Sequence, residues 1–262
     1  MYKLLLLLLP TLLFSKFQVT TSLPFEAHIV KQIGQNHIRI KTISNNFSNK
    51  ILDLSPTEIS SLAGTRVYFN FGLDIEKEYE KIFLKSRKEL NAVNMSKDIK
   101  KLKYEGEDNP FVWFDPILLR EVAKNIYETL SKIDPYNKND YEANYYNFLN
   151  KLDASFLEIK KKLADSEIYN IFVFDEKFDY FAKRFKINKY IRKKRILSAS
   201  EIKPLVRFVK KNQIKVVFIE ENKNINFAKS LSGHSNILIK TFNPYEELLF
   251  YNLSKIAQEF IE

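Results

Sequence analysis

The chain has 262 residues, of which 45% are hydrophobic, and its 42 Lys and Arg outnumber 32 Asp and Glu to give a formal net charge of +10. This length and composition exclude a disordered tail and suit one large domain or two of ordinary size. The basic residues are interspersed with acidic ones, which favours a solvated surface over a nucleic-acid-binding stripe, so we expect no nucleic-acid partner. The absence of cysteine from the sequence excludes disulfide bonds.

Residues 1–16 are typical of a signal segment. Lys3 precedes an apolar run from Leu4 to Phe14, which is shorter than the roughly 20 residues that a helix needs to span a bilayer. No cysteine is available for lipid modification near the N-terminus. We therefore expect an exported protein, periplasmic or at the cell surface, without a lipid-anchor cysteine.

Beyond the signal segment, β-rich runs alternate with segments of helical periodicity. In the first half we expect strands at 17–22, 37–43 and 66–71 and helices at 23–33 and 56–62. In the second half we expect strands at 168–174, 215–220 and 236–242 and helices at 176–185, 199–212, 224–232 and 244–261. Strands that alternate with helices predict an α/β fold of two lobes, each with a mainly parallel sheet flanked by helices.

Three of these helices have a serine or asparagine three positions before a glutamate, which is the pattern of a capping box. The pairs are Ser55 with Glu58, Ser198 with Glu201, and Asn243 with Glu246. They predict that the helices begin directly after the serine or asparagine of each pair.

The region between the two halves has helical periodicity and no strand pattern. From Asp140 to Leu163, apolar residues recur on one helical stripe, and about 24 residues form a rod of roughly 36 Å. Such a rod favours a helix that links two lobes over a long core helix of a single domain. We therefore expect an N-terminal lobe at 17–115, helical segments including the linking helix at 116–163, and a C-terminal lobe at 164–262.

The motif DNPFVWFDP at 108–116 and the helical stretch that follows it resemble the metal-receptor solute-binding proteins of zinc and manganese ABC transporters. The resemblance covers nearly the whole exported chain and includes LSPTEISSLAGTRVYFNFGLDIE, which begins at Leu54, and FNPYEELLF, which begins at Phe242. It implies two α/β lobes joined by a rigid helix, with a metal ion in the cleft between them. It also implies a monomeric protein whose partner is an ABC transporter permease in the membrane.

The resemblance implies metal ligands at four positions, which fall here on Lys50, Phe111, Asp175 and Asn243. A lysine ammonium and a phenyl ring offer no lone pair to a metal, so Lys50 and Phe111 are substituted ligand positions. Asp175 and Asn243 supply one charge and two oxygens, a set that suits manganese, magnesium or calcium better than zinc, and Glu176 is a third candidate ligand. The structural alternatives stay open, because Asn243 suits a helix N-cap and Glu176 suits an exposed carboxylate near a helix N-terminus.

We expect Phe111 to fill the space of an imidazole. If Lys50 reaches the cleft, we expect its ammonium beside Asp175 in the role of the missing cation. A divalent metal, manganese or zinc, is the expected class of cargo, but tight zinc binding is not expected. The histidines of the chain fall on none of the four positions: His28, His37 and His234.

The sequence therefore predicts an extracytoplasmic solute-binding protein of a metal-ion ABC transporter, with non-standard or lost metal ligands. The alternative is a metal-free binding module or adhesin-like protein on the same fold. An enzyme is not expected, because the sequence shows no Ser-His-Asp or Cys-His set and no glycine-rich phosphate loop, and it has five glycines in all.

Overall fold

The computed structural model of the chain describes residues 16–261 with the exception of 49, 51–52, 87–90, 193–197, 222 and 224. Residues 1–15 of the expected signal segment lie outside the described residues. Within the described ranges, no helix combines the length and the apolar character required to cross a membrane.

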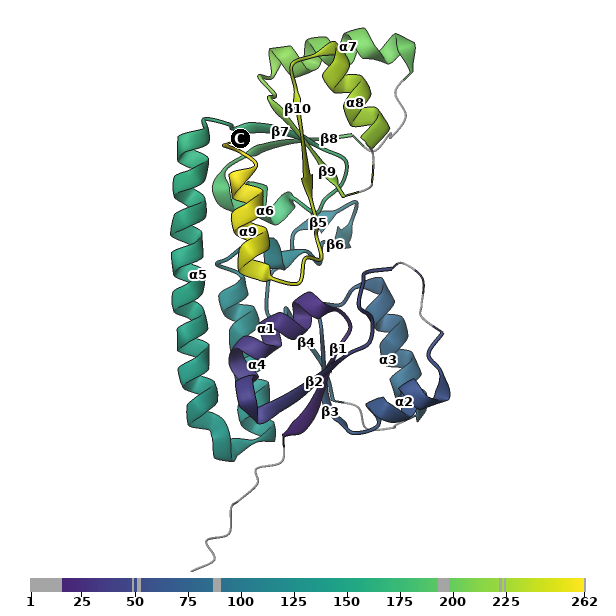
Figure 1. Ribbon diagram of the computed structural model, residues 1–262, viewed down its shortest axis with the longest axis vertical. Coiled ribbons are helices and arrows are strands. Elements are labelled where there is room, and N and C mark those ends of the chain that lie inside the picture. Colours follow the sequence, from purple (N-terminus) through teal and green to yellow (C-terminus); the bar gives the residue numbers. More distant parts are fainter. Residues whose placement is uncertain are drawn as a thin grey trace, which may run out of the picture.

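The first sheet has four parallel strands in the order β2-β1-β3-β4. Helices lie on both of its sides (Figure 1), and β1 is buried along its whole length. The polar residues of β1 are hydrogen-bonded inside the sheet, since the side chains of Gln18 and Thr20 both reach the hydroxyl of Thr65, at 3.1 and 2.6 Å. The strands are β1 (Phe17–Thr21), β2 (Ile38–Thr42), β3 (Thr65–Asn70) and β4 (Ala92–Asn94).

The second sheet repeats this arrangement with four parallel strands in the order β10-β9-β7-β8. One of its sides packs against helices α7 (Ala199–Lys211) and α8 (Ile225–His234) around a separate hydrophobic cluster that includes Phe172, Val217 and Phe227. The strands are β7 (Asn170–Val173), β8 (Asn188–Ile191), β9 (Val216–Glu220) and β10 (Leu238–Phe242).

Helices account for most of the remaining described residues. Those that follow the strands of the first sheet are α1 (Pro24–Gly34), α2 (Pro56–Leu62), α3 (Asp74–Ser86) and α4 (Leu119–Ile133). Those of the second half are α6 (Asp179–Phe185), α7 (Ala199–Lys211), α8 (Ile225–His234) and α9 (Leu249–Gln258). Three short 3-10 turns at Gln35–His37, Val112–Phe114 and Pro135–Asn137, and a two-stranded hairpin of β5 (Lys103–Tyr104) and β6 (Glu107–Asp108), complete the set.

Helix α5 (Lys138–Ser166) runs unbroken for 29 residues along both sheets (Figure 1). It packs against α1 and α4 at one end and against α9 at the other. Hydrogen bonds join it to both lobes: the side-chain amide of Asn144 donates to the carbonyl of Ile33 at 3.0 Å, and Lys162 Nζ donates to Ser254 Oγ at 2.8 Å. The predicted fold class, two parallel α/β lobes joined by a long linking helix, is confirmed.

We expect Leu152→Ala to lower the free energy of unfolding by about 2–5 kcal/mol, because truncating a buried leucine loses its transfer energy and leaves a cavity. Leu152 is fully buried on α5, in the hydrophobic core that runs through both lobes. Leu157 lies on the same helix and is 63% exposed, so Leu157→Ala is the matched control, with a change within about 0.5 kcal/mol. Urea denaturation followed by circular dichroism measures both. Equal losses for the two variants would contradict the orientation of α5.

Two of the three predicted capping boxes are present. The backbone N–H groups of Ser55 and Ser198 donate to the carboxylates three residues on, at 2.7 and 3.0 Å. The third is wrong, because α9 begins at Leu249 instead of directly after Asn243. The side-chain oxygen of Asn243 accepts the N–H of Tyr245 at 3.0 Å and closes a turn in place of a helix start.

Candidate ligand-binding cleft

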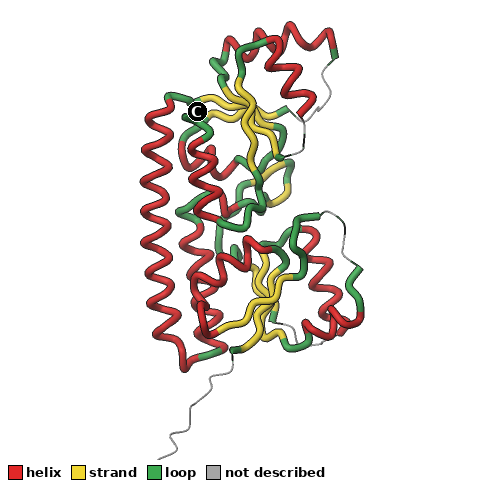
Figure 2. Tube along the Cα trace, in the orientation of Figure 1, coloured by secondary structure: helices red, strands yellow, loops and turns green. Residues whose placement is uncertain are grey.

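A cleft of about 1040 Å³ lies where the loops of the two lobes meet. Residues 72–75 after β3, together with the β5–β6 hairpin, line it from the first half of the chain. Glu176 and Lys177 after β7, and Tyr245 after β10, line it from the second half. Figure 2 shows loops from both sheets meeting in the middle of the molecule. Because ligands of parallel α/β sheets bind outside the carboxyl ends of the strands, this cleft is the candidate site.

Phe111 lines the cleft and is itself 5% exposed. Its backbone N–H donates to the side-chain oxygen of Asn109 at 2.9 Å. The side-chain amide of the same asparagine donates across the cleft to the backbone carbonyl of Glu176 at 3.0 Å. Asn109 thereby fixes the aromatic motif and the loop after β7 against each other, and Phe111 faces the second lobe.

The ring of Phe111 packs between another aromatic ring and a cation. Its centroid lies 5.1 Å from that of Trp113, and Lys177 Nζ lies over the ring at 5.4 Å from the centroid. An ammonium over an aromatic face is attracted by the ring quadrupole. The position at which the resemblance implied a metal-binding histidine is thus occupied by a ring that contacts a lysine ammonium.

Lys177 forms ion pairs with two carboxylates of the second lobe. Its Nζ lies 2.9 Å from Asp175 Oδ2 and 3.4 Å from Glu220 Oε2, and the side chains of Lys177, Asp175 and Glu220 are 13%, 18% and 10% exposed. A further hydrogen bond stabilises the loop after β7: the backbone N–H of Lys177 donates to Asp175 Oδ1 at 3.1 Å. Burial by itself lowers the pKa of Lys177, but Asp175 and then Glu220 raise the pKa above its ordinary value, so the side chain stays charged.

Both oxygen atoms of Asn243 accept hydrogen bonds, one from the loop after β10 and one from α9. The side-chain oxygen accepts the N–H of Tyr245, and the backbone carbonyl accepts the side-chain amide of Asn252 at 2.9 Å. Burial, followed by the charges of Glu220 and Asp175, raises the pKa of Tyr245, whose ring centroid lies 6.3 Å from that of Phe111. Asn243 therefore lies near the cleft as a loop-stabilising residue.

Lys50 does not line the cleft, so the condition under which its ammonium was expected beside Asp175 is not met. Lys50 is exposed, and its described hydrogen bond runs from its backbone N–H to Ser48 Oγ. The residue of this segment that lines the cleft is Phe47, whose ring stacks on Tyr245 at 3.8 Å between centroids. The cation beside Asp175 is Lys177, two residues away in the chain. Neither Lys177 nor Glu220 was predicted from the sequence, because no motif marks them.

The donors present in the cleft do not fit a metal ion as they stand. Over the described residues, no group of three or more His, Cys, Asp and Glu side chains is arranged to hold one. Zinc requires about four N, S or O ligands, whereas Asp175 and Glu220 are both paired with a lysine ammonium. The arrangement is that of a closed ion-pair network beside aromatic rings.

The remaining lysines of the cleft differ in their pairing. Lys77 and Lys103 form ion pairs with Asp74 and Asp108 at 2.9 and 2.6 Å. Lys101 makes no ion pair or hydrogen bond with the described residues, and burial lowers its pKa. Lys223, which also lines the cleft, pairs with Glu220 at 2.6 Å. Among the described residues that line the cleft, Lys101 is therefore the lysine whose ammonium no carboxylate contacts directly.

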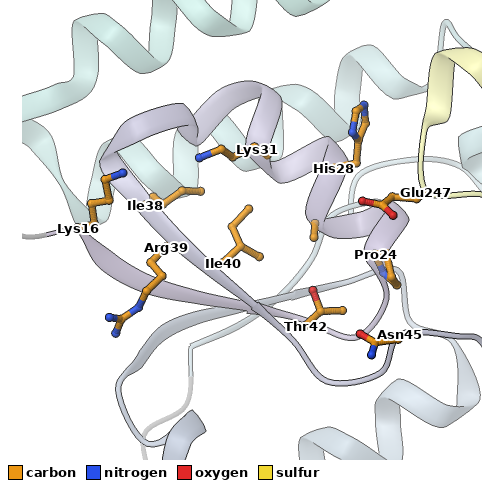
Figure 3. Close-up of a pocket in the computed structure, with 11 residues that line it drawn as sticks. Lys16, Pro24, His28, Lys31, Ile38, Arg39, Ile40, Thr42, Asn45 and Glu247 are labelled. Carbon is orange, nitrogen blue, oxygen red and sulfur yellow. The ribbon is translucent and has the colours of Figure 1, made fainter.

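The three histidines lie away from the cleft. His28 lines a separate hollow on the outer side of α1 and β2, near Glu247 (Figure 3). His37 Nε2 lies 2.8 Å from Asp140 Oδ2, and His234 Nδ1 lies 2.8 Å from the carbonyl of Ser230. None of them is placed to bind a ligand in the cleft.

A pair of buried carboxyl groups supports the first-lobe side of the cleft. Glu26 on α1 and Glu76 on α3 each accept two backbone N–H groups from the loop before their own helix, at distances between 2.6 and 3.1 Å. The second oxygen of each finds no donor among the described residues if both acids are ionised. Burial, and then the charge of Glu76, raises the pKa of Glu26 well above its ordinary value, so a proton on Glu26 supplies the missing hydrogen bond to Glu76.

The chain matches the family model described as zinc-uptake complex component A, periplasmic, over residues 19–257. The metal ABC transporter substrate-binding lipoprotein ScbA of Streptococcus cristatus is 26% identical over 275 residues, which cover 93% of this chain and 89% of the relative. The zinc-binding protein AdcA of Streptococcus pyogenes serotype M6 is 27% identical over 144 residues, which cover 53% of this chain and 28% of the relative. The crystal structure of ZnuA superposes with a TM-score of 0.83 at 22% identity, covering 94% of this chain and 98% of the other. The last comparison concerns the fold alone.

Proposed function

Since the chain belongs to the family of periplasmic zinc-uptake complex component A, we propose that it is an extracytoplasmic solute-binding protein that works with the membrane permease of a metal-ion ABC transporter. The observation that carries this proposal is the family match across both lobes and the linking helix, with the cleft at the carboxyl ends of the strands. The proposal includes export, action as a monomer and no catalytic activity.

We propose that the cleft is the binding site for the transported solute, and that Asp175, Glu176 and Asn243 are the candidate oxygen donors. Two of them already have partners within the protein: Asp175 forms an ion pair with Lys177, and the side-chain oxygen of Asn243 accepts a hydrogen bond from Tyr245. We therefore expect at most weak binding of hard divalent ions such as manganese and no tight zinc binding.

ScbA is described as a lipoprotein, whereas this sequence contains no cysteine. The relatives therefore give no support to the expected absence of a lipid anchor, which stays a prediction. Mass spectrometry of the protein purified from its own cells tests it, because an acyl chain changes the mass of the N-terminal peptide.

We expect the protein to stimulate ATP hydrolysis by the permease–ATPase complex of its own transporter in proteoliposomes. The reason is that substrate-binding proteins of this family act by docking on the permease. The Leu157→Ala protein, altered at an exposed position on α5, is the control for a folded protein with an unchanged cleft and should stimulate equally. An ATPase rate that is the same with and without the protein would count against the transporter role.

The second candidate function is a metal-free binding module on the same fold. Phe111 and Lys177 favour it, because together they fill the expected metal position with a ring and an ammonium. Stimulation of the ATPase that persists in the presence of a strong chelator would favour a non-metal cargo carried by the same transporter. Tight binding to another surface protein without any effect on the permease would favour the metal-free module.

A further inference from the structure

Lys177 lies between the ends of two neighbouring strands of the second sheet. Asp175 follows β7, and Glu220 is the last residue of β9, which pairs with β7 (Figure 1). The Nζ atom contacts one carboxylate oxygen from each, at 2.9 and 3.4 Å. A cation held by oxygens from two adjacent strand ends occupies the edge of the sheet where α/β proteins bind ligands.

Lys177 is the ion-pair partner that the two carboxylates share. Their side chains are 18% and 10% exposed, and Glu220 Oε2 has no hydrogen bond to any described residue, so the 3.4 Å ion contact with Lys177 is its described polar contact. The other oxygen of Glu220 pairs with Lys223 at 2.6 Å. Because the side chain of Lys223 is 44% exposed, solvent screens this second ion pair. Removing a buried partner would leave charges uncompensated, which is costly.

The Nζ atom of Lys177 also lies over the ring of Phe111, at 5.4 Å from its centroid. A phenyl face stabilises an organic cation but offers no lone pair to a metal ion. The surroundings of Nζ therefore suit an ammonium, and they provide two anionic groups that would suit a divalent ion if the ammonium were absent.

We propose that Lys177 is the specificity-determining residue of the cleft: its ammonium occupies the position between Asp175 and Glu220 that a divalent cation would need, and so excludes free metal ions. This inference rests on the proposed function, because it specifies which cargo the cleft rejects. It also explains why Phe111 is accommodated where a ligand was expected.

The test is a gain of binding by Lys177→Ala, which removes the ammonium and leaves room for an ion with its water. Titration with manganese, followed by calorimetry and by the electron paramagnetic resonance signal of free Mn²⁺, is expected to show one-to-one binding that is on the order of tenfold or more tighter than in the unaltered protein. Adding Asp175→Asn to this variant should abolish the gain. Lys101→Ala is the matched control, since it removes a lysine from the same cleft that contacts neither carboxylate, and it should create no binding.

Two results would overturn the proposal. One is a folded Lys177→Ala protein that binds manganese no better than the unaltered protein. The other is tight manganese or zinc binding by the unaltered protein that Lys177→Ala leaves unchanged.

A second variant covers the case in which Lys177→Ala does not fold. Lys177→Met keeps the length of the side chain and its contact with Phe111 while removing the charge. We expect it to melt at a lower temperature than the unaltered protein, and we expect Glu220→Gln to restore part of that loss. If Glu220→Gln lowers the melting temperature by the same amount with Lys or Met at position 177, the proposed charge compensation is wrong. Neither variant bears on permease stimulation by the unaltered protein, so failure of this inference and failure of the transporter role remain distinguishable.

Discussion

Trp113→Ala is expected to lower the free energy of unfolding by about 3–5 kcal/mol. The indole is 1% exposed, with the rings of Phe25 and Phe71 at 4.8 and 4.9 Å between centroids. Its N–H donates to the carbonyl of Pro244 in the second half of the chain at 2.9 Å. Truncation therefore removes packing in the first lobe and a hydrogen bond to the loop after β10 at once.

Trp113→Phe separates these two contributions, because it keeps an aromatic ring and removes the donor. We expect a loss of about 1–3 kcal/mol, which corresponds to an unsatisfied buried carbonyl. Both variants lack the only tryptophan of the chain, so unfolding is followed by far-ultraviolet circular dichroism. A loss for Trp113→Ala that is no greater than that for Trp113→Phe would contradict the packing role of the indole.

Glu26→Gln is expected to raise stability at neutral and alkaline pH relative to the unaltered protein, by about 1–3 kcal/mol. The pKa of Glu26 is raised by burial and then by the charge of Glu76, so the native state holds a proton that the unfolded chain releases near pH 4.5. A group whose pKa is raised on folding contributes stability that is fully present below the unfolded pKa and is lost as the pH rises through the folded pKa. The glutamine amide mimics the protonated acid, because it donates to Glu76 at every pH.

The measurement is the free energy of unfolding by urea between pH 4 and pH 9. The unaltered protein should lose stability as the pH rises over this range, and Glu26→Gln should show a smaller slope. Glu58→Gln is the matched control, because Glu58 occupies the same capping-box position on α2 and is fully exposed, with a pKa lowered by its hydrogen bonds to Ser55. Parallel pH profiles for the unaltered protein and Glu26→Gln would show that the two buried acids do not share a proton.

The sequence predicted the features that depend on local pattern. Six strands and the linking helix appear where alternation and helical stripes indicated them, because both lobes use the same strand–helix unit. Short edge strands such as β4 and β8 were missed, since three or four residues carry too little pattern. Helix α3 was also missed, and the beginning of α9 was placed too early because Asn243 and Pro244 form a turn instead of a helix start.

The candidate site was less predictable than the fold. The motif around Phe111 could be located because Val112 and Trp113 fix its register, and the structure places Phe111 in the cleft. No motif fixes the segment near Lys50, and there the structure places Phe47 in the cleft instead. The ion-pair partner of Asp175 depends on how two strand ends and a loop meet in space. The periodicity of a single sequence gives no information about such contacts between segments.

Helix α5 has a consequence for the proposed recognition of this protein by a transporter. One continuous helix is packed against α1, α4 and α9, and Asn109 and Trp113 hydrogen-bond across the lobes. Bending the molecule would break these contacts together, so the lobes behave as a single stiff frame. If the protein docks on a permease as proposed, we expect the ligand-bound and ligand-free molecules to differ in the loops at the mouth of the cleft, so that the permease recognises a local change in surface shape and charge instead of a change in overall dimensions.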